Sequence, residues 1–486
     1  MLSDKRYQNI ILNNVLFIIL KKRWLVDMKN VNYKLNNRVE GSLKCILGIS
    51  LPLILSALSD SILHLIDRMI LAYYSLDSMN AAAISGNLAC VFSFMFVAIA
   101  GVAEIYVGQN NGAKNYDKLA VPTWQMIYLS AIAVVVFFPI GYFAEYINLL
   151  PECYLKEGIE YQRPLTYLCF IPILKVAFAA FFIGQGKTKI ITISVFAGSA
   201  INAILDYFLI FGYKDIVPEL GCKGAAIATI IAEIIQVLIL AKVFFNKSNR
   251  INYKTAKSYK FNKEIFFGCF KIASPMAIGR MIELLAWYVV YATVSHISKE
   301  MATIQGICVT IYLQFAFVCE GLNKSASTIS ANLIGSRDLE AIKKTFKTFI
   351  KITLIMGGII MIPLIIFPNY IFMILDMLRE NVSGLYGDMS IIFKILVLNI
   401  TLEALGSVTW GFLLSGGDTK YPIIANLSTL WGFVVIPLCV LFYMDQLTSA
   451  VTIYWLTTLW GISSFFLIYK RFKSLKWYTL LVSKSD

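Results

Sequence analysis

Apolar residues along the chain form long runs separated by short polar breaks. Most runs reach the roughly 20 residues that a helix needs to cross a bilayer. The pattern predicts twelve membrane-spanning helices, near residues 45–73, 80–107, 119–146, 157–183, 189–213, 223–246, 265–296, 302–331, 344–367, 388–415, 420–443 and 447–470. We therefore expect an all-α integral membrane protein.

Composition supports this interpretation. Of the 486 residues, 58% are hydrophobic and 15% are charged, whereas about a quarter of a soluble domain is charged. The net charge of +14 could indicate a nucleic-acid partner. However, the cations gather at the termini and in the polar breaks that follow the second, fourth, sixth and eighth spans, which is the pattern of cytoplasmic loops. We therefore predict cytoplasmic termini and no nucleic-acid partner. Nine single cysteines without a C-x-x-C motif support neither a zinc site nor a disulfide framework.

The two halves of the chain repeat each other. Pro52 and Pro275 are 223 residues apart, as are Gly112 in QNNGAKN and Gly335 in NLIGSRD, and GQGKTK matches SGGDTK at an offset of 231. These matches indicate a duplicated six-helix unit, a recurrent design in transporters. We predict a cytoplasmic tail, an N-lobe, a linker, a C-lobe and a second cytoplasmic tail, at residues 1–44, 45–246, 247–264, 265–470 and 471–486.

Ionisable residues inside the spans are the candidate functional groups, because each costs about 2.5–3.5 kcal/mol at the centre of a membrane. We expect Glu104 and Glu320 to lie near span ends, where their side chains can reach the membrane surface. Four other acids lie deeper or among apolar neighbours, namely Asp67, Asp206, Glu283 and Glu403.

Two local groupings sharpen this set. Asn202 and Asp206 are four residues apart, so they share a helix face and can meet Asp67 at one site. Their carboxylate and amide oxygens suit Na⁺ or a proton. Arg280 and Glu283 are three residues apart and form either a functional group or a buried pair that neutralises itself.

The stretch SDSILHLIDR raises two further alternatives. Asp60 is equivalent to Glu283 by the 223-residue offset, so it is either a second cation ligand or a hydrogen-bonded cavity residue. His64 lies one turn before Asp67. It either shares a proton with Asp67, since histidine titrates near neutral pH, or is a packed histidine with satisfied hydrogen bonds.

From about residue 45 to 470 the chain resembles the MATE (multidrug and toxic compound extrusion) family of the MOP flippase superfamily. The resemblance rests on LPLILSALSDSILHLIDRMILAYYS, GQNNGAKNYDKL, GQGKTKIITISVFAGSAINAILDYFLIFG, LGCKGAAIATIIAE, SPMAIGRMIELLAW and LEALGSVTWGFLLSGGDTKYP. It implies two six-helix lobes around a V-shaped cleft. It also implies a transporter rather than an enzyme, with Na⁺ or H⁺ as coupling ion and no other cofactor.

The resemblance also implies roles for individual residues. The ion-coupling site would comprise Asp67, Asn202, Asp206 and Thr229, with Na⁺ possible at the first three. A second candidate cation site would comprise Glu283 and Glu403, to which the repeat adds Asp60. Four cationic or titratable residues depart from the family pattern and would tune the acids or contact substrate, namely His64, Arg68, Lys175 and Arg280.

We therefore expect a monomeric antiporter of the plasma (inner) membrane, surrounded by lipid, that exports small organic compounds of cationic or amphipathic character. The alternative is a flippase or exporter of an anionic lipid-linked or phosphorylated substrate, which Arg68, Lys175 and Arg280 would favour. No G-x-x-x-x-G-K-[ST] motif is present, which argues against an ATP-driven pump.

Overall fold

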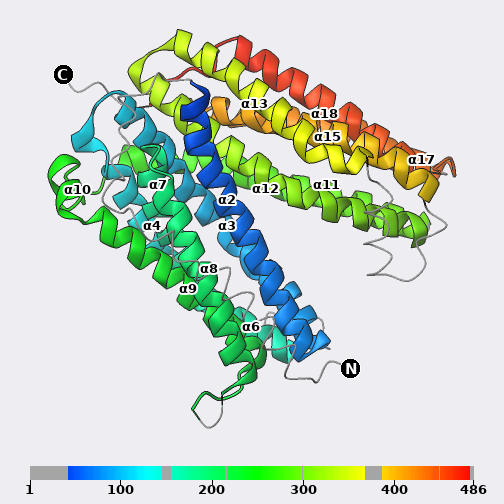
Figure 1. Ribbon diagram of the computed structural model, residues 1–486, viewed down its shortest axis with the longest axis horizontal. Helices are drawn as coiled ribbons and strands as arrows, with labels where there is room; N and C mark the ends of the chain where they lie inside the picture. The colour runs from blue at the N-terminus through cyan, green and yellow to red at the C-terminus, as the bar shows by residue number, and fades with distance from the viewer. Residues whose placement is uncertain are drawn as a thin grey trace.

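The computed structural model describes residues 42–144, 155–213, 216–297, 299–366, 386–447 and 449–481. Its helices form two groups that meet at one end and diverge toward the other (Figure 1). The N-lobe contains α2 Leu43–Tyr74, α3 Leu76–Gly112, η2 Tyr116–Lys118, α4 Val121–Tyr142, α6 Leu155–Tyr167, α7 Phe170–Gly184, α8 Lys189–Phe211 and α9 Gly221–Phe244.

The short helix α10, Lys247–Asn252, follows the N-lobe and begins the predicted linker. The C-lobe contains α11 Lys263–Ile297, α12 Lys299–Ser336, α13 Leu339–Ile366, α15 Tyr386–Ser415, α16 Lys420–Leu430, the π-helical turn η5 Trp431–Val435, α17 Ile436–Tyr443 and α18 Ala450–Lys473. Within the described residues, nine helices are long and apolar enough to cross a membrane, or ten if α6 and α7 form one span. The predicted all-α membrane fold is confirmed.

Two predicted spans are interrupted next to prolines. The helices α6 and α7 meet at an angle of 44°, and Pro172 lies in the first turn of α7. A proline has no N–H to donate to the preceding turn, so a helix that reaches it bends or restarts. The η5 turn likewise ends just before Pro437. Such π-helical turns accommodate a local break in the regular hydrogen bonding.

The two lobes touch where α3 crosses α12. A Cβ atom added to Gly112 would lie 1.9 Å from the carbonyl oxygen of Asn332, and one added to Gly335 would lie 2.1 Å from that of Gln109. Asn111 also donates a hydrogen bond to Asn332 at 2.7 Å. The helices therefore pack backbone to backbone, which only residues without a side chain allow.

This contact is reinforced by residues 474–481, which lie in the segment predicted as the second cytoplasmic tail. After α18 the backbone turns at Leu475, where φ is +56°, and Trp477 is fully buried. The side chain of Gln109 then accepts the N–H of Leu481 at 2.6 Å and donates to the carbonyls of Thr479 at 3.1 Å and Ser415 at 2.8 Å. One N-lobe side chain thus binds two segments on the C-lobe side.

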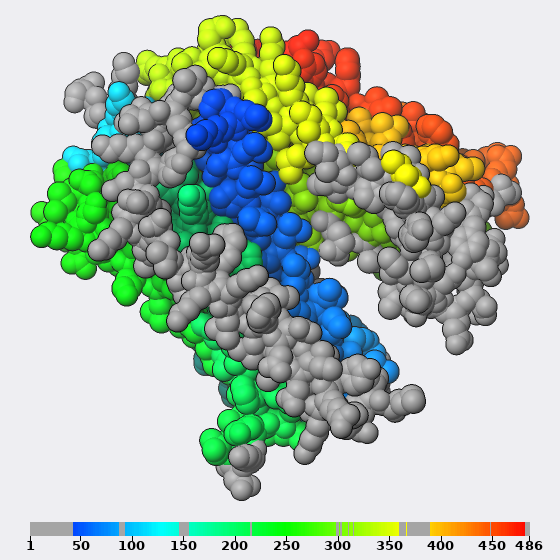
Figure 2. Space-filling model, viewed as in Figure 1, coloured from blue at the N-terminus to red at the C-terminus, as the bar shows by residue number. Residues whose placement is uncertain are grey.

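Beyond this contact, which we call the seam, the lobes separate. Figure 2 shows the surface hollowed between one end of α2 and the C-lobe, while the other end of α2 lies against the C-lobe. The turn between α3 and α4 and the turn between α12 and α13 both lie at this end. These are the lysine- and arginine-bearing breaks that the sequence assigns to the cytoplasm. In that orientation the cleft opens to the outside.

Candidate functional site: a carboxyl pair in the N-lobe

Serines bring α2 and α8 together around the acid site. Ser56 donates to Thr192 at 3.1 Å, and Ser59 and Ser199 are hydrogen-bonded at 3.1 Å. Small polar residues at helical spacing allow close approach of helices and satisfy each other inside a membrane protein. Two turns further along α2, the same face presents Asp67, which is 5% exposed. The packing of these two helices therefore buries Asp67 against α8.

Asn202 and Asp206 of α8 complete the site, and both side chains are fully buried. With its amide nitrogen facing the acid, Asn202 donates to Asp206 Oδ2 at 3.1 Å, and its oxygen accepts the N–H of Thr229 at 3.2 Å. The Thr229 hydroxyl instead donates to the carbonyl of Ala225 at 3.1 Å in its own helix. The Thr229 backbone thus donates to the site, while its hydroxyl is hydrogen-bonded within its own helix.

The carboxyl groups of Asp67 and Asp206 lie within hydrogen-bonding reach of each other. Ionised carboxylates are acceptors only, so a hydrogen bond between the two groups requires one shared proton. Among the described residues, Asp67 Oδ1 has no hydrogen-bond partner. The donor set therefore offers a proton-binding pair and one unused buried oxygen. Carboxylate and amide oxygens are also acceptable to Na⁺, a hard cation.

His64 and Arg68 lie on the exposed side of α2. The charge of His64 acts on both Asp60 and Asp67, and that of Arg68 acts on Asp67. His64 is not the packed histidine that the sequence left as an alternative, because α2 turns this side chain outward. Both residues can influence the acid site electrostatically without lying inside it.

Asp60 does not join the C-lobe acids as the repeat suggested. The charged groups that act on it most strongly are Lys175, His64, Lys324 and Glu233. Lys175 of α7 is paired with Glu233 of α9 at 2.8 Å. Equivalent positions in a duplicated chain lie in different lobes, so the offset relates Asp60 to Glu283 by symmetry rather than by contact.

The C-lobe acids form a separate group. Arg280 Nη1 lies 3.0 Å from Glu283 Oε2 on α11. The charges of Glu283 and Arg280 both act on Glu403 of α15. The charge of Glu403 in turn acts on Tyr312 of α12. Arg280 thus supplies positive charge to two acids at once. A cation is thus paired directly with one of the C-lobe acids, whereas among the described residues the structure shows no ion pair to Asp67 or Asp206.

Two acids expected near span ends, Glu104 and Glu320, differ in exposure, and Lys324 of α12 was not among the predicted functional groups. Glu104 is only 8% exposed, so it does not reach a membrane surface. Glu320 pairs with Lys324 at 2.8 Å on α12, and their four-residue spacing was the available signal.

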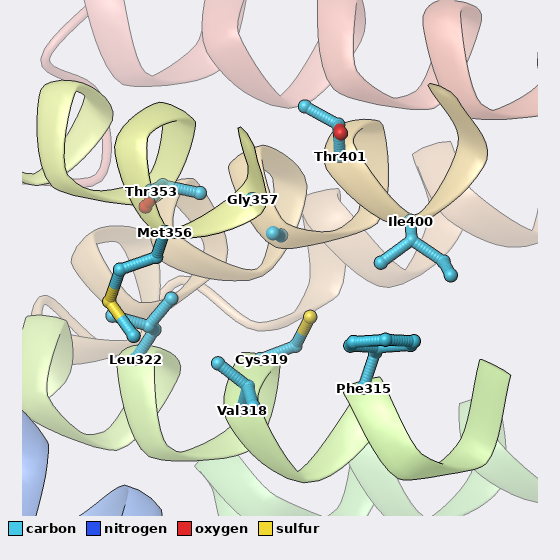
Figure 3. Close-up of a pocket in the computed structure, with 10 residues that line it drawn as sticks. Phe315, Val318, Cys319, Leu322, Thr353, Met356, Gly357, Ile400 and Thr401 are labelled. Atoms are coloured by element: carbon cyan, nitrogen blue, oxygen red, sulfur yellow. The ribbon is translucent and has the colours of Figure 1, made fainter. Parts of the chain in front are cut away.

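An apolar cavity lies in the C-lobe between α12, α13 and α15 (Figure 3). Figure 3 shows Phe315, Cys319, Leu322 and Met356 directed into it. The cavity has room for about one molecule of the size of water. This cavity is too small to be the path of an organic substrate.

Comparison with known proteins identifies the family. The family model MatE matches residues 52–208 and 275–441, one match in each lobe. The chain belongs to the MatE family. It is therefore a multi-pass membrane transporter of a multidrug efflux family, and not an enzyme. The two matches also agree with the internal duplication read from the sequence.

Curated relatives of this MATE protein extend over most of its length. It is 24% identical over 402 residues to "Probable multidrug resistance protein YoeA" of Bacillus subtilis (strain 168), covering 78% of this chain and 83% of the relative. It is 25% identical over 432 residues to "Multidrug export protein MepA" of Staphylococcus aureus (strain MRSA252), covering 85% and 89%.

Solved structures share the fold at lower identity. A multidrug resistance MATE family transporter of the MOP superfamily, described in an outward-facing conformation, aligns with a TM-score of 0.77 at 16% identity. That alignment covers 89% of this chain and 96% of the other. A MOP superfamily transporter from Pyrococcus furiosus gives the same TM-score at 17% identity and the same coverage.

Proposed function

We propose that this MATE protein is a secondary active antiporter that exports small organic compounds of cationic or amphipathic character. A proton or Na⁺ entering through the Asp67–Asn202–Asp206 site would drive export. The observation that carries the proposal is the buried carboxyl pair of Asp67 and Asp206. Two carboxyl groups that can hydrogen-bond only by sharing a proton favour H⁺ as the coupling ion.

The coupling follows from charge. When the pair gives up its proton, two carboxylates face each other in a buried site, and their repulsion favours separation of α2 from α8. When a proton returns, the hydrogen bond reforms and the helices close. Alternating access then opens the cleft to one side of the membrane and afterwards to the other. In this proposal the termini lie on the cytoplasmic side of the plasma (inner) membrane, and the monomer is the working unit.

The alternative of an anionic substrate is less well supported. Its motivation was the intramembrane cations, yet Lys175 is paired with Glu233 and Arg280 with Glu283. A cation that is already neutralised has little attraction left for a phosphate or another anion. Among the described residues, Arg68 is the one of these three cations for which the structure shows no ion pair, and it lies exposed on α2. One such residue does not define an anion site.

Reconstitution tests the proposal directly. Proteoliposomes would be loaded with ethidium, an organic cation, or with carboxyfluorescein, an organic anion, and given a pH gradient or a Na⁺ gradient separately. We expect a pH gradient to drive ethidium export and neither gradient to move carboxyfluorescein. Export of the anion only, or export that follows neither gradient, would contradict the proposed antiport.

A further inference from the structure

The linker between the lobes is held against the first turns of α4. Trp124 Nε1 donates a hydrogen bond to the carbonyl of Thr255 at 2.7 Å, and the Tyr128 hydroxyl donates to the carbonyl of Tyr259. The two α4 side chains are four residues apart, so they lie on one face of the helix. Because α4 belongs to the candidate span Tyr116–Tyr142, this part of the linker lies at the end of a membrane span.

Lys260 occupies the centre of the held segment. Gln125 of α4 donates to the carbonyl of Lys260 at 3.1 Å and accepts the N–H of Asn262 at 2.9 Å, so one buried amide fixes this part of the backbone twice. The Lys260 side chain is exposed, as are the neighbouring rings of Tyr259 and Phe261, at 54% and 52%. Aromatic rings and lysines side by side are typical of the level at which a bilayer meets water.

The charge of this segment has one sign. Residues 253–263 include no acid and four exposed lysines, namely Lys254, Lys257, Lys260 and Lys263. Lys254 is paired with Asp117 of η2, and Glu264 is the first acid that follows. Among the described residues, the structure shows no ion pair for the other three lysines. Lysines held beside a membrane surface attract the anionic headgroups of its lipids.

The face of α4 that holds the linker continues away from it as an apolar stripe. Ile132 and Val135 follow Tyr128 by four and seven residues, so the three side chains lie on one face. Ile132 is 46% exposed and Val135 is 75% exposed. An acyl chain that lies along this stripe brings its headgroup to the lysines of the linker. The combination of charge and apolar stripe therefore fits a phospholipid better than a free anion.

We propose that residues 255–263 and the adjoining face of α4 bind an anionic phospholipid of the cytoplasmic leaflet. The phosphate lies among Lys257, Lys260 and Lys263. The rings of Tyr259 and Phe261 lie at the level of the glycerol, and an acyl chain follows α4. The bound lipid thereby fastens the connection between the lobes to the N-lobe. The site shares no residue with the acid pair, so it does not depend on the proposed antiport.

Native mass spectrometry of the full-length protein in a neutral detergent measures the lipid affinity. The wild type should bind dioleoyl phosphatidylglycerol at least about tenfold more tightly than dioleoyl phosphatidylcholine, which has the same chains and no net charge. A triple variant with Lys257→Gln, Lys260→Gln and Lys263→Gln should lose most of this preference. The matched control carries Lys344→Gln, Lys347→Gln and Lys351→Gln, three exposed lysines in the first turns of α13, and should keep it.

A further variant separates geometry from charge. Gln125→Leu keeps every lysine but removes the two hydrogen bonds that fix the linker, so it should weaken phosphatidylglycerol binding at least about threefold. If its melting temperature without lipid shows that it does not fold, Trp124→Phe, which removes only the bond to Thr255, takes its place. Equal affinity of the wild type for the two lipids, or an equal loss in the two lysine triples, would overturn the inference. Displacement of phosphatidylglycerol by millimolar inorganic phosphate would also overturn it, because the lysines would then hold a soluble anion.

Discussion

Gly112 of α3 and Gly335 of α12 occupy equivalent positions in the two halves and make reciprocal contacts. Gly112 faces the carbonyl of Asn332, and Gly335 faces the carbonyl of Gln109. Gln109 and Asn332 are themselves 223 residues apart, the offset that relates the two glycines. The seam is therefore a near-symmetric crossing of two related helices, and each glycine is required by the backbone of the other lobe.

Replacing Gly112 with alanine should prevent the seam from closing, because the new Cβ atom would lie 1.9 Å from a backbone oxygen. We expect the lobes to separate at this end, seen as a longer distance between spin labels at Lys114 and Lys344. Gly406→Ala is the control, since a Cβ atom there meets nothing within 4 Å. A Gly112→Ala protein with the wild-type distance would show that the seam tolerates a side chain.

Gln109 should contribute strongly to the closed seam. Gln109→Leu leaves the Leu481 N–H and two carbonyls without their partner, at a cost of about 1–3 kcal/mol for each buried group. The closed state should lose population, measured as faster hydrogen exchange in residues 474–481. Gln185→Leu provides a matched control, because Gln185 is also buried but donates only to Phe181 in its own helix. Equal exchange rates in the two variants would argue against this role.

Much of the fold could be predicted because the membrane imposes a strong pattern. Each span needs a long apolar helix with its backbone bonds satisfied internally, so the runs of apolar residues gave the helices. The bend between α6 and α7 and the π-helical turn were not predicted. Both depend on how a proline is accommodated by its neighbours, and prolines elsewhere, such as Pro52 within α2, interrupt nothing.

The acid site was predicted only in part. Asp67, Asn202 and Asp206 meet as expected because helical spacing and a family motif both indicated them. Thr229 could not be placed, since the direction of its hydroxyl depends on a competing carbonyl in its own helix. The C-terminal segment was missed because its partner Gln109 lies in the other lobe, and contacts between lobes leave no local periodicity in the sequence.

The stability of the seam end should depend on pH through Lys187, which lies in the turn between α7 and α8. Burial lowers the pKa of Lys187 from 10.5 to about 8, although its ammonium lies 4.8 Å from the centre of the Tyr253 ring. Between these values the unfolded chain binds more protons than the folded one, so stability rises with pH. Relative to Lys187→Gln, the wild type should gain on the order of 2 kcal/mol from pH 8 to 10.5.

Thermal unfolding in detergent across this pH range checks the effect of Lys187. The difference in melting temperature between the wild type and Lys187→Gln should be constant below pH 8 and should change only above it. A difference that is flat up to pH 10.5 would mean that burial does not disfavour the charged lysine.

The C-lobe acids should be dispensable for ion coupling. Arg280 pairs with Glu283 at 3.0 Å and acts on Glu403, so positive charge already lies beside both acids. We expect Glu403→Gln to keep pH-driven ethidium export within about threefold of the wild type, which corresponds to less than 1 kcal/mol. Export in this variant that no longer responds to the pH gradient would instead place the coupling site in the C-lobe.

The most direct test of the central claim is pH-driven export by Asp67→Asn in proteoliposomes. An amide in place of the carboxyl removes the shared proton while keeping the shape of the side chain. The coupling site in the N-lobe predicts that gradient-driven export falls by at least about tenfold, while ethidium binding persists. If the Asp67→Asn protein exports ethidium under an imposed pH gradient as fast as the wild type does, the Asp67–Asp206 pair does not couple transport.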